Sequence, residues 1–210
     1  MNAESSEQVD EQGAPAEAPQ ASAPAARSRR GLVALAVLAL GLLIGGGVWY
    51  QLSQPYHFLT VEQGVLYRSG QLRQEDLERV IAKHGIKTVV NLQPERLNGL
   101  AWHDEEEAAC RNQGAQLVDM PIEAQVPPSA EQLAAWLKLL EDESRRPILV
   151  HCQHGVVRTG MLVAAYEIEF QGKPPAQALE DLPDFGHDLT KSKHDRMRAF
   201  IRDYRPTLSK

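Results

Sequence analysis

The chain has 210 residues, 43% of them hydrophobic and 24% charged, which is ordinary globular usage and leaves room for one folded domain beside any tails. The formal net charge of −6 argues against nucleic acid as a partner, because binding a phosphate backbone draws on clustered Lys and Arg. The two cysteines, Cys110 and Cys152, lack the spacing of a zinc site, so we predict neither a metal nor another cofactor. Whether they form a disulfide is left open, since a sequence does not give their separation.

Residues 1–30 are rich in Ala, Glu, Gln, Pro and Ser and contain no aromatic residue. So few apolar groups do not offset the conformational entropy that a chain loses on ordering. We therefore predict a disordered N-terminal tail over residues 1–30.

Residues 31–50 form an uncharged run, GLVALAVLALGLLIGGGVWY, that as a helix would span about 30 Å, the thickness of a bilayer's hydrocarbon core. Three arginines within residues 27–30 precede the run, whereas the next Lys or Arg after it is Arg68. This asymmetry predicts a single-pass membrane protein with one transmembrane helix over residues 31–50 and a cytoplasmic N-terminus. The domain that follows would lie on the far side, which is the periplasm in a bacterium.

Two alternatives exist for this apolar run. A buried core helix normally has a polar stripe, and nothing polar interrupts this run. A cleaved export signal fits the arginine pair before the run, but no Ala-x-Ala site follows it and its apolar length exceeds a usual signal core. The pattern therefore favours an uncleaved anchor.

From about residue 54 onward, short β-branched runs alternate with helical stretches. Such alternation predicts an α/β domain over residues 54–210, with a central sheet flanked by helices. The predicted strands are 65–67, 88–92, 116–120 and 148–151, and the predicted helices are 74–84, 101–112, 130–141, 159–170 and 192–204.

A buried strand, a tight loop and a helix start follow one another at residues 148–160, ILVHCQHGVVRTG. Backbone N–H groups of such a loop, with the positive end of the helix, converge on a bound anion. Cys152 lies in this positive field, which lowers a thiol pKa and favours the thiolate. Arg158, six residues later, is placed to offer paired donors to two phosphate oxygens, and Thr159 to hydrogen-bond the sulfur. His151 is expected to fix the loop backbone.

The pattern His-Cys-x-x-Gly-x-x-Arg-Thr-Gly resembles the signature of the protein tyrosine and dual-specificity phosphatase superfamily. The segments 67–71, 85–92 and 120–122 look like the compact bacterial and fungal-type members, so the resemblance covers roughly residues 56–205. It implies a cysteine-phosphatase fold and a metal-independent reaction in which a phosphoryl group passes to the cysteine and is then hydrolysed. The expected partner is a phosphorylated protein or a small phosphoester.

The resemblance also implies roles for residues of the loop. Cys152 would be the nucleophile, Arg158 the phosphate clamp and Thr159 the partner of the thiolate, while Arg68 and Asn91 are interpreted as structural. The phosphate cradle would be the backbone of Gln153, His154, Gly155, Val156, Val157 and Arg158.

One position departs from the family pattern. The family supplies an Asp general acid from a loop before the nucleophile, and one alignment places Ala124 where that Asp belongs. Glu123, next to it, is the first candidate for the acid and Asp119 the second. Should neither serve, the acid would come from Asp181, Asp184 or Asp188, or the enzyme would work without one.

Two other classes remain open for the chain. A catalytically silent phosphate-binding module would keep the cradle but lack turnover for want of an acid. A rhodanese-like sulfurtransferase also uses a cysteine on a loop, but the Arg158-Thr159 pair and the upstream segments count against it.

Overall fold

The structure, a computed structural model, describes residues 29–52, 54–97 and 99–208 of the chain, with side chains in the first range described for 31–46. The chain divides into two compact units, Met1–Trp49 and Tyr50–Lys210. The predicted disordered tail lies outside the described residues except for Arg29 and Arg30, which open a helix.

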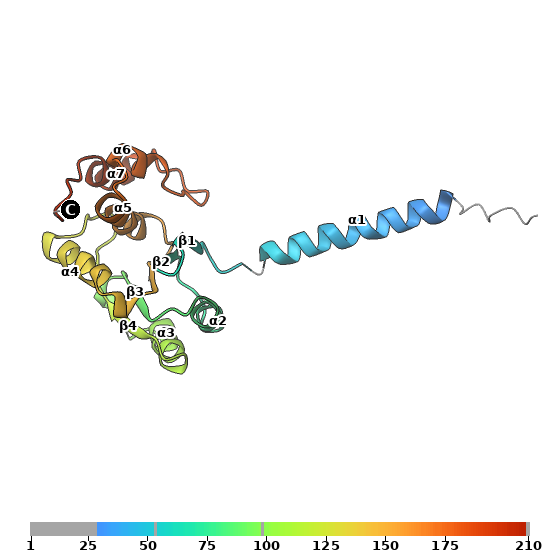
Figure 1. The fold of residues 1–210 in the computed structure, drawn as a ribbon, viewed down its shortest axis with the longest axis horizontal. Coiled ribbons are helices and arrows are strands. Elements are labelled where there is room, and N and C mark those ends of the chain that lie inside the picture. The colour runs from blue at the N-terminus through green and yellow to red at the C-terminus, as the bar shows by residue number, and fades with distance from the viewer. Residues whose placement is uncertain (1–28, 53, 98, 209–210) are drawn as a thin grey trace, which may run out of the picture. The chain divides into compact units, whose positions relative to one another are not determined.

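Helix α1 (Arg29–Leu52) contains the apolar run and extends past both of its predicted ends (Figure 1). Its described side chains, at residues 31–46, are all exposed, among them Leu42 and Leu43. Within the described residues, no helix combines the length and the apolarity needed to cross a membrane. The predicted transmembrane helix over residues 31–50 has no support from this finding and stays a prediction.

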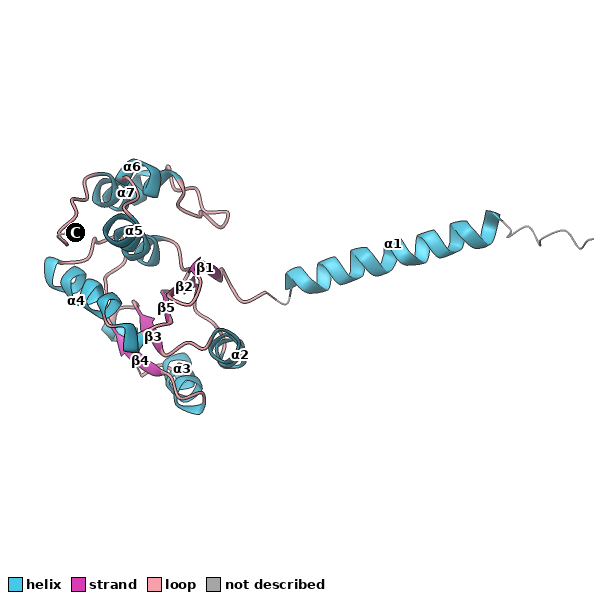
Figure 2. Cartoon of the chain, viewed as in Figure 1, coloured by secondary structure: helices cyan, strands magenta, loops and turns pink. Residues whose placement is uncertain are grey.

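The second unit is built on a five-stranded sheet (Figure 2). Its order is β1-β2-β5-β3-β4, with β1 antiparallel to β2 and the other pairs parallel. The predicted strands are confirmed to within two residues, whereas β1, a short edge strand, was not predicted from the sequence. The strands are β1 (Leu59–Glu62), β2 (Leu66–Ser69), β3 (Thr88–Asn91), β4 (Gln116–Asp119) and β5 (Ile148–His151).

Helices cover both faces of the sheet, which confirms the predicted α/β fold. Side chains alternate along a strand, so Ile148 and Val150 of β5 pack on one face, while Leu149 packs on the other. Helices α2 (Gln74–His84) and α3 (Ala101–Asn112) lie on the face of Leu149; α4 (Ala130–Glu141) and α5 (Val157–Gln171) lie opposite.

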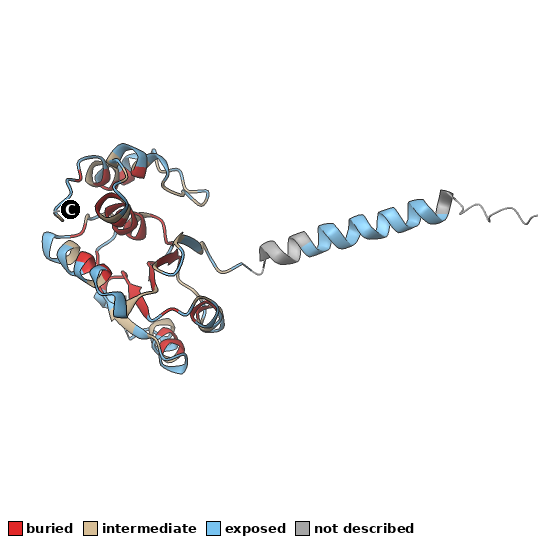
Figure 3. Ribbon diagram, in the orientation of Figure 1, coloured by how far each residue is buried: buried red, intermediate tan, exposed pale blue. Residues whose placement is uncertain are grey.

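Helix α5 is the most deeply buried helix of this unit, and Figure 3 shows it and the strands β2, β3 and β5 largely in red. A third apolar cluster, which includes Met161 and Ile201, packs α6 (Pro175–Glu180) and α7 (Asp195–Arg202) against α5. The predicted helix 192–204 is thus shorter: a 3-10 turn, η3 (Ser192–His194), precedes α7. Two further 3-10 turns, η1 (Glu95–Leu97) and η2 (Glu143–Arg145), complete the described elements.

The register of the parallel strands gathers their carboxyl ends at one edge of the sheet. Ser69 of β2 and Asn91 of β3 both pair with His151 of β5, and Asp119 of β4 pairs with Asn91. In parallel sheets, ligand sites lie beyond the carboxyl ends of the strands. The loops after β2, β3, β4 and β5 therefore meet at this edge.

Candidate active site

A pocket of about 290 Å³ opens over the loop that joins β5 to α5. Cys152 and the loop residues after it form its floor, Ala124 and Gln125 come from the loop after β4, and the segment before α7 supplies a basic wall. Its lining residues are Ala124, Gln125, Cys152, Gln153, His154, Val156, Val157, Arg158, His187, Lys193 and His194. The structure thus brings the predicted nucleophile, clamp and most of the predicted cradle together.

Cys152 is buried, with 3% of its surface exposed. Burial by itself raises the pKa of a thiol, but the Arg158 guanidinium, the Thr159 hydroxyl and backbone N–H groups of the loop outweigh it. The pKa of Cys152 is therefore lowered, as the sequence predicted for the nucleophile. A lowered pKa increases the fraction of thiolate, which is the reactive form.

Arg158 lies beside the thiol and is held by the ends of two neighbouring strands. Its Nη1 donates to the carbonyl oxygen of Leu92 at 3.1 Å and to that of Ile122 at 3.5 Å. A guanidinium carries five N–H donors, so these contacts fix its plane and leave further donors for a phosphate. The loops after β3 and β4 thus orient the clamp.

Gly155 allows the loop to pack against the strand beside it. Its φ is +67°, and a Cβ atom there would overlap the carbonyl group of Ser69. Only glycine fits a left-handed position with so little space. The Gly155 carbonyl in turn accepts a 2.6 Å hydrogen bond from Nη2 of Arg68, which is buried. Arg68 therefore supports the loop, as predicted for a structural residue.

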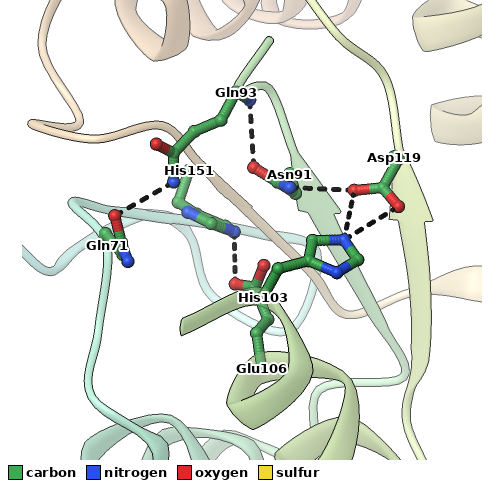
Figure 4. A network of polar contacts seen from close by, with 7 residues as sticks. All are labelled: Gln71, Asn91, Gln93, His103, Glu106, Asp119 and His151. Atoms are coloured by element: carbon green, nitrogen blue, oxygen red, sulfur yellow. Dashed lines mark hydrogen bonds and ion pairs between the residues drawn. The ribbon is translucent and has the colours of Figure 1, made fainter. Parts of the chain in front are cut away.

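His151, the last residue of β5, contacts a glutamate of α3 (Figure 4). Nε2 of His151 lies 2.7 Å from Oε1 of Glu106 on α3, and both side chains are almost fully buried. Burial acts to lower the pKa of His151, but the charges of Glu106 and Cys152 outweigh it, so this pKa is raised. A hydrogen bond with the backbone of Cys152 adds to the effect. Sequence reasoning assigned the loop contact of His151 but missed its partner Glu106.

The two candidate acids lie near the pocket but do not line it. Glu123 is exposed and receives hydrogen bonds of 2.5 and 2.7 Å from Arg96. The Asp119 carboxylate accepts a 2.8 Å hydrogen bond from the side-chain amide of Asn91. It also lies 3.2 Å from Nε2 of His103 (Figure 4). Of the described residues in the loop after β4, the ones that line the pocket are Ala124 and Gln125.

The basic wall of the pocket comes from the segment between α6 and α7, which contributes His187, Lys193 and His194. His154 of the loop lies at the rim, where the Tyr56 hydroxyl is 3.2 Å from its Nδ1. Burial, and the nearby His187 and His57, lower the pKa of His154.

The three later carboxylates that the sequence offered as the acid have other partners and are not among the residues that line the pocket. Asp181 pairs with Lys173 at 3.1 Å, Asp184 accepts a hydrogen bond from the N–H of Gly186, and Asp188 accepts one from the N–H of Thr190.

The two cysteines are both free, and they belong to different apolar clusters. No disulfide joins them in this structure.

A buried cysteine of lowered pKa that shares a pocket with an arginine, on a strand–loop–helix with the spacing Cys-x5-Arg, defines the class of cysteine phosphatases. Within that class, residues 54–197 match the family model described as "DSP-PTPase phosphatase fused to NAD+ Kinase". This match covers more than half of the chain, and the chain belongs to this family.

Curated relatives match the same part of the chain. NAD kinase 2, chloroplastic, of Arabidopsis thaliana is 33% identical over 101 residues, which are 48% of this chain and 10% of that protein. The dual specificity protein phosphatase TpbA of Pseudomonas aeruginosa strain UCBPP-PA14 is 29% identical over 134 residues, 64% of this chain and 57% of TpbA. The chain thus spans about a tenth of the NAD kinase and less than three fifths of TpbA.

Solved structures share the fold. The crystal structure of P. aeruginosa TpbA has a TM-score of 0.56 at 25% identity, over 71% of this chain and 86% of that one. The core catalytic domain of the PP-IP phosphatase SIW14 of S. cerevisiae, in complex with citrate, has a TM-score of 0.60 at 23% identity, over 72% and 86%. The latter likeness concerns the fold alone.

Proposed function

We propose that the protein is a metal-independent phosphatase that hydrolyses phosphoesters through a phosphocysteine intermediate on Cys152. The observation that carries this proposal is that buried Cys152 and Arg158 line one pocket at the start of α5, and the Arg158 charge acts to lower the pKa of the thiol. A thiolate and a clamp for phosphate oxygens are the two groups that this chemistry requires.

The reaction has two displacements at phosphorus. In the first, the Cys152 sulfur forms a bond to phosphorus while the bond from phosphorus to the leaving oxygen breaks. Backbone N–H groups of the loop and Arg158 bind the phosphoryl oxygens as charge develops on them. A general acid gives a proton to that leaving oxygen. In the second, water attacks phosphorus, gives a proton to the same carboxylate, and the P–S bond breaks. The Thr159 hydroxyl then stabilises the departing thiolate, and inorganic phosphate leaves.

The proposed substrate is a phosphotyrosine or another phosphorylated residue of a protein. The basic side chains in the pocket wall, including Lys193 and His187, favour an anionic ligand. One crystal structure of TpbA shows a cysteine-to-serine variant in complex with pTyr. Other relatives are named for inositol substrates, namely SIW14 and the inositol diphosphatase DSP3 of Arabidopsis thaliana. A panel of phosphopeptides and inositol phosphates, followed by phosphate release, separates these classes.

For the general acid we propose Glu123. It immediately precedes Ala124, which lines the pocket. Its partner Arg96 is as exposed as Glu123 itself, and exposed ion pairs contribute only about 0–1 kcal/mol, so releasing Arg96 costs little. Asp119 is second, because Asn91 and His103 both hold its carboxylate at the end of β4.

Substrates with different leaving groups test this assignment. Nitrophenolate leaves without much help, whereas an alkoxide from phosphoserine needs a proton. Glu123→Gln should therefore lower kcat about 10²–10⁴-fold on a phosphoserine peptide and far less on p-nitrophenyl phosphate. Asp119→Asn is measured in parallel, and a leaving-group dependence in that variant alone would assign the acid to Asp119. Equal effects of Glu123→Gln on both substrates would remove Glu123 from this role.

We also propose that residues 31–50 anchor the protein in a membrane, with the catalytic unit on the non-cytoplasmic side. This proposal rests on the sequence of the run and its preceding arginines. The apolar run continues to Tyr50, beyond the described side chains of α1. A C-terminal alkaline phosphatase fusion should be active. A fluorescent protein that folds only in the cytoplasm should stay dark, and the reverse pair of results would overturn the orientation.

The alternative function is a silent phosphate-binding module, which would bind phosphate without turnover. It is favoured by one observation, that Ala124 occupies the pocket wall where the family has its acid. Hydrolysis of p-nitrophenyl phosphate by the full chain distinguishes the two, because this substrate hardly needs an acid. Phosphate binding without any hydrolysis would favour the module.

A further inference from the structure

Glu106 is a buried carboxylate in a run of three glutamates on α3. Only 5% of its surface is exposed, whereas Glu105 and Glu107 are exposed and Glu107 pairs with Arg111 on the next turn. A helix of average amphipathicity would place an apolar residue at the buried position. The chain instead places a carboxylate there, so its burial needs a reason.

His151 supplies the partner that makes this burial tolerable. An unpaired buried carboxylate costs several kcal/mol, and pairing offsets that cost only with close geometry. Nε2 of His151 lies at ion-pair distance, 2.7 Å, from Oε1 of Glu106 (Figure 4), and Oε2 has no hydrogen-bond partner among the described residues. Replacing such a pair with apolar residues is often neutral or stabilising. Stability alone therefore does not account for a charged pair at this place.

The other charged groups near His151 already have contacts of their own. Arg68 of β2 supports Gly155, and Arg158 of α5 bonds the loops after β3 and β4. His103, one turn before Glu106 on α3, lies 3.2 Å from Asp119 of β4 (Figure 4). Cys152 is the next residue after His151, and their charges act on each other. Among the described groups, Glu106 is the carboxylate that pairs with His151.

We propose that Glu106 is a positioning residue that keeps His151 as an imidazolium behind the loop and thereby favours the thiolate of Cys152. The proposal rests on the proposed phosphatase function only for its use in catalysis. The order of effects runs outward from α3: the carboxylate stabilises the imidazolium, and the imidazolium stabilises the thiolate. Loss of the carboxylate charge should leave His151 neutral in its buried place and Cys152 less ionised.

Alkylation of Cys152 tests this order without turnover, because iodoacetamide reacts with the thiolate and not with the thiol. We expect Glu106→Gln to reduce the alkylation rate of Cys152 at pH 6 about tenfold, and to move the midpoint of the rate–pH profile upward. Glu105→Gln, one residue earlier on the same helix, is the matched control and should keep the wild-type profile. Glu106→Asp, which retains the charge, should recover part of the rate.

The double variant Glu106→Gln with His151→Asn covers the case in which the single change prevents folding, because it leaves neither buried charge unpaired. It should show the same tenfold loss, since the imidazolium is gone. A wild-type profile in the folded Glu106→Gln protein, or in the double variant, would overturn the proposal. If the wild-type protein alkylates at low pH but releases no phosphate, the proposed function fails while this inference stands.

Discussion

The two cysteines of the chain are buried to almost the same extent and have opposite chemistry. Cys110 on α3 is 2% exposed and Cys152 is 3% exposed. Burial, with the charges of Glu106 and Glu107, raises the pKa of Cys110 to about 12. At Cys152 the effect of burial is outweighed by Arg158 and by hydrogen bonds, and the pKa is lowered. Burial alone therefore does not decide reactivity; the signs of the neighbouring charges do.

Glu106 takes part on both sides of this comparison. Its charge acts directly on Cys110 and disfavours a thiolate there. Through His151 it is proposed to act on Cys152 in the opposite sense. One buried carboxylate would thus keep one cysteine inert and help to ionise the other, with the sheet between them.

The largest expected effect is the loss of the nucleophile. Cys152→Ser should abolish hydrolysis of p-nitrophenyl phosphate while phosphate still binds, because an alcohol stays protonated where the thiol ionises. Cys110→Ser is the control, and its kcat should stay within a few-fold of the wild type. The contrast between the cysteines breaks down if the two variants lose similar amounts of activity.

Arg158→Lys should have the next largest effect. A lysine retains the charge but not the paired donors, and removing one preorganised donor typically costs about 10²–10³-fold in kcat. Arg111→Lys on the surface of α3 serves as the control for the substitution itself. A kcat within threefold of the wild type would show that Arg158 contributes charge and no more.

Selective labelling measures the comparison between the cysteines directly. The lowered pKa of Cys152 means that its thiolate persists as the pH falls below the ordinary thiol value of 9.0 and is lost only on protonation at the lower pKa. The raised pKa of Cys110 keeps its thiol neutral up to about pH 12. Iodoacetamide at pH 8, with peptide mapping, should therefore label Cys152 and leave Cys110 intact until the protein unfolds. Labelling of Cys110 first would reverse the assignment.

The smallest expected effect concerns stability. Cys110 packs in the cluster of α2 and α3, away from the pocket. Cys110→Ala should lower the free energy of unfolding by about 1 kcal/mol through the small cavity that it leaves, and should not change kcat. Thermal denaturation with parallel kinetics measures both. A change in kcat without a change in stability would contradict the interpretation of Cys110 as a packing residue.

The sequence predicted the centre of the site better than its surroundings. The loop from Cys152 to Arg158 could be predicted because its chemistry fixes a spacing within one short segment. Glu106 could not, since a run of three glutamates on a helix usually indicates a solvated face and only packing shows which one is buried. His187 and His194 likewise come to the pocket through the packing of α7 on α5.

The helices and strands show the same contrast between features that a local pattern predicts and features that only packing defines. Elements with a clear local signal, such as the apolar run of β5 and the helical periodicity of α4, were predicted closely. Helix α4 also has a local start signal, a capping box between Ser129 and Gln132. The edge strand β1 (LTVE) is as short as β5 but lacks its run of apolar residues, and α6 has only six residues, so tertiary contacts define both.

Trapping the intermediate tests the central claim most directly. The full chain, treated with EDTA and mixed with a phosphotyrosine peptide or p-nitrophenyl phosphate, is quenched within milliseconds and digested for mass spectrometry. A covalent phosphoryl group on Cys152 of the wild-type protein, absent from Cys152→Ser, is the predicted result. Phosphate release that stops in EDTA and returns with a divalent ion, with no phosphoryl group on Cys152, would contradict the account.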